Sequence, residues 1–113
     1  MKRSLLLLPT LAGCAVQVPS NLQPEHQSLA QVVPARGVQI YECRDAKWVF
    51  VAPEADLFDR SGKRIGTHYA GPAWESADGS KVVGAVKARS DAPAAGAIPW
   101  LLLSTKSVAG EGA

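Results

Sequence analysis

The amino-acid sequence has little cysteine, few aromatic side chains and no long hydrophobic run. Two cysteines in 113 residues cannot supply the disulfide framework that holds many small secreted domains together. A transmembrane helix needs about 20 consecutive apolar residues, and no stretch reaches that length. The chain has 10 glycines, yet none forms a phosphate-binding loop, and the nucleophile elbow and C-x-x-C pair are missing too. The sequence therefore lacks the signatures of common nucleotide-binding, serine-hydrolase and thiol-redox classes.

The first fourteen positions, MKRSLLLLPTLAGC, do carry a strong signal. Two basic residues precede a short apolar core, and small residues then lead into Cys14, which is the layout of an export signal. A buried N-terminal helix is the alternative, but Pro9 inside it would cost about 3 kcal/mol. The segment resembles a bacterial lipoprotein signal. This implies cleavage after Gly13, a signal peptide of residues 1–13 and a lipid anchor at Cys14.

The consequences of such an anchor are a membrane attachment and a compartment. Several acyl chains at roughly 0.8 kcal/mol per buried CH2 group hold a protein stably on a bilayer. The resemblance also implies the outer membrane, because Ala15 follows the cysteine where an aspartate would mark retention at the inner membrane. We expect an exported lipoprotein of the bacterial cell envelope, on the outer membrane or facing the periplasm.

The mature chain, without residues 1–13, would also carry no net charge. The sequence has 12 Lys and Arg against 10 Asp and Glu, and Lys2 and Arg3 would leave with the signal. A balanced chain without a basic patch predicts no nucleic-acid partner and no electrostatic attraction to anionic lipid. Lipidation at Cys14 would leave Cys43 as the only thiol. An odd cysteine in an exported protein indicates a missing partner, intermolecular pairing or a buried free thiol.

The rest of the chain is predicted to be a tether and one small β domain. Residues 14–33 form the tether, with one or two helical turns possible over residues 25–33, and residues 34–113 form the domain. Strands are indicated by β-favouring residues and by alternation, with turn residues between them. The predicted strands are 38–44, 48–51, 55–58, 64–69, 81–88 and 98–105.

Three details of this prediction bear on the fold. The run 48–51 is apolar on both faces, which predicts an inner strand that Pro53 ends, with Trp48 and Trp100 as core side chains. Residues 69–70 are expected to pair across a long turn with 81–88. No long amphipathic helical pattern appears. The fold class is therefore mostly β, a small β-sandwich or partly open barrel of antiparallel hairpins.

Four segments together resemble one known family. They are GVQIYECR at 37–44, APEADLFD at 52–59, GKRIGTHYAGPAWESADGSKVVGAVKAR at 62–89 and IPWLLL at 98–103. In this order they resemble the uncharacterised domain family DUF3455, which occurs in bacterial exported proteins and in secreted fungal proteins. The resemblance covers most of the mature chain and implies a domain assignment, with no activity to carry over.

The resemblance also implies that the domain is incomplete at its C-terminus. Members of the family typically continue past the IPWLLL strand into further strands that carry another cysteine. We therefore expect Leu101, Leu102 and Leu103 to lack a covering neighbour, and Cys43 to lack its disulfide partner. The loss of a disulfide costs about 2–5 kcal/mol in small secreted domains, so the domain is expected to be marginally stable.

Residues that could carry chemistry are concentrated in one segment, THYAGPAWESADGS at 67–80. His68 is a candidate general base or metal ligand, with Glu75 or Asp78 as its partner. Tyr69 and Trp74 are candidates for an aromatic platform that binds a sugar. The alternative is a purely structural role, in which the segment is a strand with a polar face followed by ordinary turns. The spacing of these residues matches no known metal-ligand pattern.

The sequence thus favours a lipid-anchored envelope protein that binds a glycan or another envelope protein, or has a structural role, without catalysis, metal or cofactor. The rival hypothesis is a small hydrolase or metal-dependent enzyme built on His68, Glu75 and Asp78.

Overall fold

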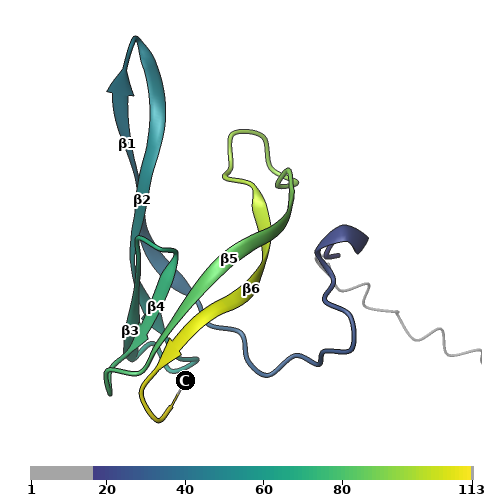
Figure 1. Cartoon of the computed structure of the whole chain (residues 1–113), viewed down its shortest axis with the longest axis vertical. Coiled ribbons are helices and arrows are strands. Elements are labelled where there is room, and N and C mark those ends of the chain that lie inside the picture. Colours follow the sequence, from purple (N-terminus) through teal and green to yellow (C-terminus); the bar gives the residue numbers. More distant parts are fainter. Residues whose placement is uncertain (1–16, 113) are drawn as a thin grey trace, which may run out of the picture.

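The computed structural model describes residues 17–112 and contains one antiparallel sheet. A 3-10 turn, η1 (Ser20–Leu22), precedes six strands that pair in sequence order, each with the next (Figure 1). The prediction of a mostly β fold built from antiparallel hairpins is confirmed. The proposed signal and Cys14 lie outside the described residues. The strands are β1 (Ala35–Arg44), β2 (Lys47–Phe58), β3 (Arg64–Tyr69), β4 (Ala73–Ser76), β5 (Lys81–Ser90) and β6 (Trp100–Ala109).

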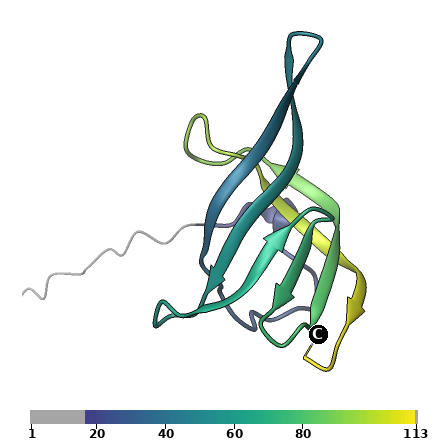
Figure 2. The same cartoon turned by 90° about the vertical axis from the view of Figure 1, so that its left-hand side faces the viewer.

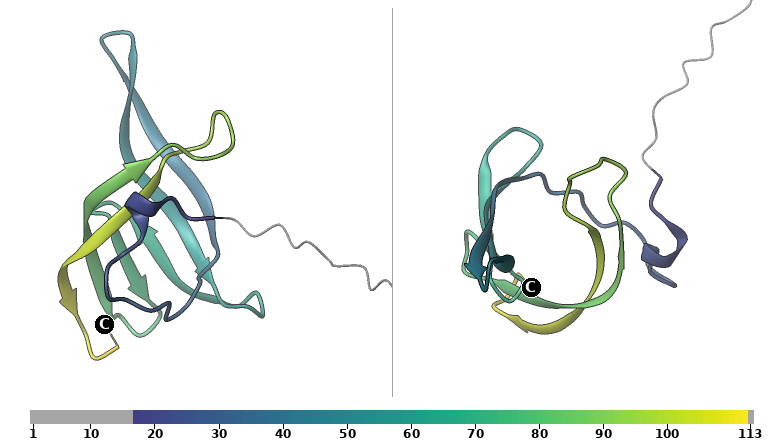
Figure 3. Two further views of the ribbon diagram at one scale, coloured as in Figure 1. Left: turned by 90° about the vertical axis from the view of Figure 1, so that its right-hand side faces the viewer. Right: turned by 90° about the horizontal axis from the view of Figure 1, so that it is seen from above.

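The sheet curls into a partly open barrel rather than a sandwich. Figure 2 shows the strands side by side from β1 to β6, and the right-hand view of Figure 3, from above, shows the sheet curved into an incomplete ring. Over residues 17–112 the edge strands β1 and β6 do not pair, so the barrel is open between them. The segment before β1 is attached to β5, because the side-chain amide of Asn21 donates to the carbonyl oxygen of Arg89 at 3.1 Å and Leu22 is buried.

Short turns fix the register of the first two hairpins. The β1–β2 turn has Asp45 and Ala46 at φ 49° and 61°, which is the left-handed two-residue geometry that suits twisted antiparallel strands. In the β2–β3 turn one carboxylate oxygen of Asp59 accepts from the backbone N–H groups of Ser61 and Lys63 at 2.9 and 3.0 Å. Gly62 lies there at φ 87°, as the sequence predicted for a bulged hairpin.

Three local predictions were wrong. Pro53 does not end the second strand, because β2 pairs with β3 only from Ala55 onward, and the missing N–H of Pro53 interrupts no ladder on that side. The long turn expected between residues 70 and 81 contains β4, which pairs with both β3 and β5. Residues 25–33 form no helix, and the only turn of helix in the described chain is η1.

The sheet has two parts that differ in burial. We call residues 39–52, where β1 and β2 pair with each other and with no third strand, the arm; it extends beyond the other strands (Figure 1). We call the rest of the sheet the base. The core lies in the base, where Leu57 and Ala73 are buried.

The arm overturns the expectation of an inner strand at 48–51. Trp48 is 76 % exposed and is therefore not a core side chain. Its exposure arises because, among the described residues, no other layer packs on this part of β2. Trp100 at the start of β6 is partly buried. Within residues 17–112 no helix has the length and apolar character required to span a bilayer.

Candidate functional site

His68 and Trp74 form a cross-strand pair at the centre of the base. They are direct partners on β3 and β4, so their side chains lie on the same face of the sheet. The two rings are stacked, with centroids 4.5 Å apart and planes 14° from parallel. The Nδ1 atom of His68 lies 2.8 Å from the carbonyl oxygen of Ala73, to which an Nδ1–H group donates. The imidazole is therefore held by one hydrogen bond and one aromatic contact.

Several of the groups beside Trp74 are apolar. A Cβ atom added to Gly84 would lie 3.2 Å from the indole of Trp74 and 3.0 Å from Leu103, so a larger residue at position 84 would require these side chains to shift slightly. A pocket of about 230 Å3 opens beside Trp74 and is lined in part by Leu57, by Ile65, and by Val33 from the segment that precedes β1. The predicted polar face of β3 is thus a mixed face, on which the ring of His68 stacks against Trp74.

Glu75 and Tyr69 lie on the opposite face from His68 and Trp74. Successive residues of a strand point to opposite faces, and the register pairs Glu75 with Thr67 and with Lys81. Tyr69 pairs with Ala73, and the ammonium of Lys81 lies 5.7 Å from the centroid of its ring. The structure therefore separates Tyr69 from Trp74 and Glu75 from His68 by the thickness of the sheet.

Asp78 lies in the turn between β4 and β5. Its carboxylate accepts the backbone N–H of Ser80 at 2.8 Å, and hydrogen bonds from the backbone and side chain of Ser80 hold its pKa below the ordinary value of 3.8. Ser80 is buried and its hydroxyl accepts the backbone N–H of Gly112 at 2.9 Å. Asp78 therefore stabilises the turn, and Ser80, to which it is hydrogen-bonded, holds residue 112 next to the start of β5.

The three candidate catalytic groups thus occupy three different places. His68 is on one face, Glu75 on the other, and Asp78 is in a turn. Across residues 17–112, His, Cys, Asp and Glu side chains form no cluster of three that could hold a metal ion. Acid–base chemistry here would rest on the Nε2 atom of His68, and within residues 17–112 the strand registers place no carboxylate opposite it on its face.

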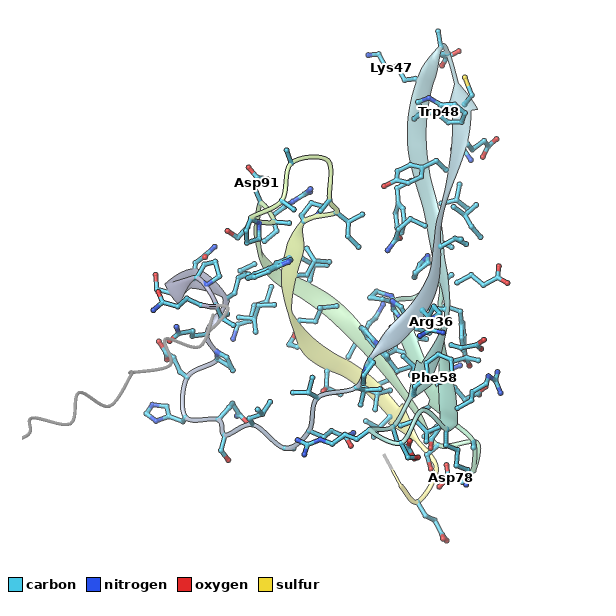
Figure 4. All side chains as sticks on the ribbon, turned by 180° about the vertical axis from the view of Figure 1, so that it is seen from behind. Arg36, Lys47, Trp48, Phe58, Asp78 and Asp91 are labelled. Carbon is cyan, nitrogen blue, oxygen red and sulfur yellow. The ribbon has the colours of Figure 1, made fainter. Side chains whose placement is uncertain are left out.

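The arm presents a different surface, which sequence reasoning missed. Cys43 pairs with Trp48 and Tyr41 with Phe50, so these four side chains lie on one face of the hairpin. The rings of Tyr41 and Phe50 meet edge to face with centroids 5.7 Å apart. We call Gln39, Tyr41, Trp48 and Phe50 the arm face; an open hollow of about 510 Å3 is lined by the first three of them. Figure 4 shows Trp48 near the tip of the arm, at the opposite end of the molecule from Asp78.

Exposure distinguishes this surface from an ordinary strand. Tyr41, Trp48 and Phe50 are 46, 76 and 52 % exposed, whereas a strand with apolar residues on both faces is normally covered. The sequence held no signal for this exposure, because the later strands β5 and β6 have ten residues each, as many as β1. The free thiol of Cys43 is exposed on the same side, next to Trp48.

Comparison with known proteins identifies a family. The family model described as "Protein of unknown function (DUF3455)" matches residues 24–113. Neither a search of curated proteins nor a search of solved structures gave a match. The matched segment includes all six strands and the approach to β1, so the resemblance seen in four motifs extends over the whole described sheet. The chain belongs to the DUF3455 family, whose function is unknown.

Proposed function

We propose that this protein is a lipid-anchored, non-catalytic binding module of the bacterial cell envelope, and that its arm face binds an envelope glycan. The observation that supports binding is the exposure of three aromatic side chains on one face of the arm, with Trp48 three-quarters exposed. A monomeric soluble domain rarely leaves such a contiguous apolar surface uncovered unless it serves an interaction.

The chemistry of the arm face suits a sugar. Exposed aromatic rings provide flat apolar surfaces, onto which the C–H faces of a pyranose ring can pack. Gln39 contributes an amide with two donors and an acceptor beside Tyr41 and Trp48, as required for sugar hydroxyls. The platform that the sequence predicted at Tyr69 and Trp74 is replaced in this proposal, because those two side chains lie on opposite faces.

The anchor in this proposal rests on the sequence alone. The layout of residues 1–14 supports lipid attachment at Cys14, and an anchored module that binds glycan would connect a membrane to the cell-wall polymer. Two experiments test the two parts separately.

Binding is tested by co-sedimentation of the full chain with purified peptidoglycan sacculi. Trp48→Ala should reduce the bound fraction at least fivefold, because it removes the largest exposed ring. Val86→Ala, at an exposed aliphatic residue of β5, is the matched control and should bind normally. Equal binding by wild type and Trp48→Ala, with circular dichroism showing both folded, would refute the arm face as the site. A hydrolytic activity lost in His68→Ala would favour the rival enzyme.

Anchoring is tested by metabolic labelling with a fatty-acid analogue. Wild-type chain should incorporate the label and partition into detergent, and Cys14→Ser should do neither. Recovery of wild-type chain that still carries residues 1–13 and no label would contradict the lipoprotein assignment.

A further inference from the structure

The outer edge of β1 is long and, within residues 17–112, has no strand partner. β1 has ten residues and pairs only with β2, so within the described chain its second row of backbone N–H and C=O groups has no strand partner. Edge strands are usually protected by short length, by proline, by charged side chains or by a bulge. The charged side chains of β1 are Arg36, Glu42 and Arg44, whose opposite signs can pair between two copies. β1 contains neither proline nor lysine, and the irregularity beside Ile40 and Tyr41 places its extra residue, Val51, on β2. The ladder offered by β1 is therefore continuous.

We propose that β1 pairs edge to edge with β1 of a second copy of this chain. The resulting homodimer has a two-fold axis through Gln39, and the two sheets join into one. An antiparallel pair of identical strands is the usual way in which a two-fold axis is built into a sheet, since the same surface serves both partners. This inference does not depend on glycan binding by the arm face.

Charge selects the register. Directly opposed residues share a face of the sheet, so a symmetric pair must join positions that differ by an even number. With Gln39 on the axis, Arg36 of each copy lies opposite Glu42 of the other. Moving the axis to Ile40 would oppose Arg36 to Arg44, and moving it to Glu42 would oppose that residue to itself. The alternative axis at Cys43 would pair only the tips of the arms.

The same register matches apolar groups. It places Val38 opposite Ile40 twice, so four aliphatic side chains from two copies meet between the two Arg36–Glu42 pairs. Val38 and Ile40 are 61 and 37 % exposed in the single chain, and pairing would cover them. On the other face the same register places Gly37 opposite Tyr41 of the partner copy.

Existing contacts of the two charged residues do not oppose this pairing. Glu42 accepts a salt bridge from Arg44 at 2.7 Å, and both side chains are more than half exposed. The guanidinium of Arg36 lies 5.5 Å from the centroid of the Phe58 ring, which leaves its N–H donors free for a carboxylate (Figure 4). Exposed pairs of this kind contribute at most about 1 kcal/mol, so they rearrange readily.

The experiment is sedimentation equilibrium of the full chain carrying Cys14→Ser, so that no acyl chain contributes to association. Arg36→Glu should weaken dimerisation about tenfold, because each dimer then holds two like-charge pairs. Glu42→Arg should do the same. The double variant Arg36→Glu/Glu42→Arg should restore association, since it recreates both pairs with reversed sign.

Two further variants separate the interface from general effects. Val38→Lys should abolish the dimer, and Val86→Lys, at a similarly exposed valine of β5, should leave it intact. In the proposed register residue 35 lies opposite Cys43 of the partner, so Ala35→Cys should form an intermolecular disulfide with Cys43 under oxidised glutathione. The two positions are too far apart along one strand to join within a chain, at about 27 Å for eight residues.

Each outcome of these experiments supports or overturns the dimer or its register. A monomer at all concentrations, or a dimer that Val38→Lys leaves unchanged, would overturn the proposal. Failure of the double charge swap to restore association, or a wild-type dimer linked through Cys43 to Cys43, would overturn the register. Restoration by the swap together with the 35–43 disulfide would establish it.

Discussion

The arm and the base are both built of antiparallel strands that contain apolar residues, and they differ in the number of neighbouring strands. In the base, three or more strands adjoin and the curled sheet covers Leu57 to 9 % exposure. In the arm, two strands pair alone, and Val51 on the same strand is 48 % exposed. An isolated two-stranded hairpin is only marginally stable in water. The comparison indicates that β2 gains its stability at one end and leaves its side chains exposed to solvent at the other.

The largest expected effect on the free energy of unfolding is that of truncating a buried side chain in the base, compared with an exposed one in the arm. Leu57→Ala should reduce the free energy of unfolding by about 3 kcal/mol, because it leaves a cavity in the base. Val51→Ala should change it by less than about 0.5 kcal/mol, because that side chain already faces solvent. Chemical denaturation followed by circular dichroism measures both. Equal losses would show that arm and base are a single stabilising unit.

A medium effect is expected at the stacked pair in the base. His68→Ala should cost about 1 kcal/mol of unfolding free energy, since it removes one hydrogen bond and one aromatic contact. A double-mutant cycle with Trp74→Ala isolates the contact between the two rings. A coupling energy indistinguishable from zero would mean that the stacking contributes nothing to stability. Phe50 and Tyr41 in the arm provide the matching cycle, for which we expect a smaller coupling energy.

The smallest effect concerns pH and the turn that closes the base. The pKa of Asp78 is held below 3.8 in the folded chain, chiefly by the hydrogen bond from the backbone N–H of Ser80. Its ionised form therefore stabilises the folded state above pH 3.8, and this contribution disappears as the pH falls through the folded pKa. We expect wild type to exceed Asp78→Asn in stability at neutral pH, and the two to converge in acid. A difference that persists at low pH would assign the effect to something other than ionisation.

The sequence predicted the hairpins well because their signals are local. Alternation over residues 38–44 and the turn residues around Gly62 determine strand and turn without reference to the rest of the chain. The short strand β4 was missed because its four residues lie between glycine, proline and aspartate turns and are recognisable only by their pairing with β3 and β5.

The candidate site was harder to predict for a related reason. His68, Glu75 and Asp78 are close in sequence, yet strand alternation and the turn between β4 and β5 direct them to three places. Conversely, Tyr41 and Trp48 gain a common face only through the register of β1 with β2. Exposure of Trp48 could not be inferred from an apolar run, because burial depends on the number of strands alongside and not on the composition of the strand itself.

The attachment of η1 to β5 sets how far the sheet could stand from a membrane. With Leu22 buried and Asn21 bonded to the Arg89 carbonyl, the chain is fixed to the domain already at residue 22. If acyl chains hold Cys14, eight residues remain between lipid and docking point, which reach at most about 28 Å when fully extended. The linker would then keep the point where η1 meets β5 within about 28 Å of the lipid surface, and the arm extends further from that point.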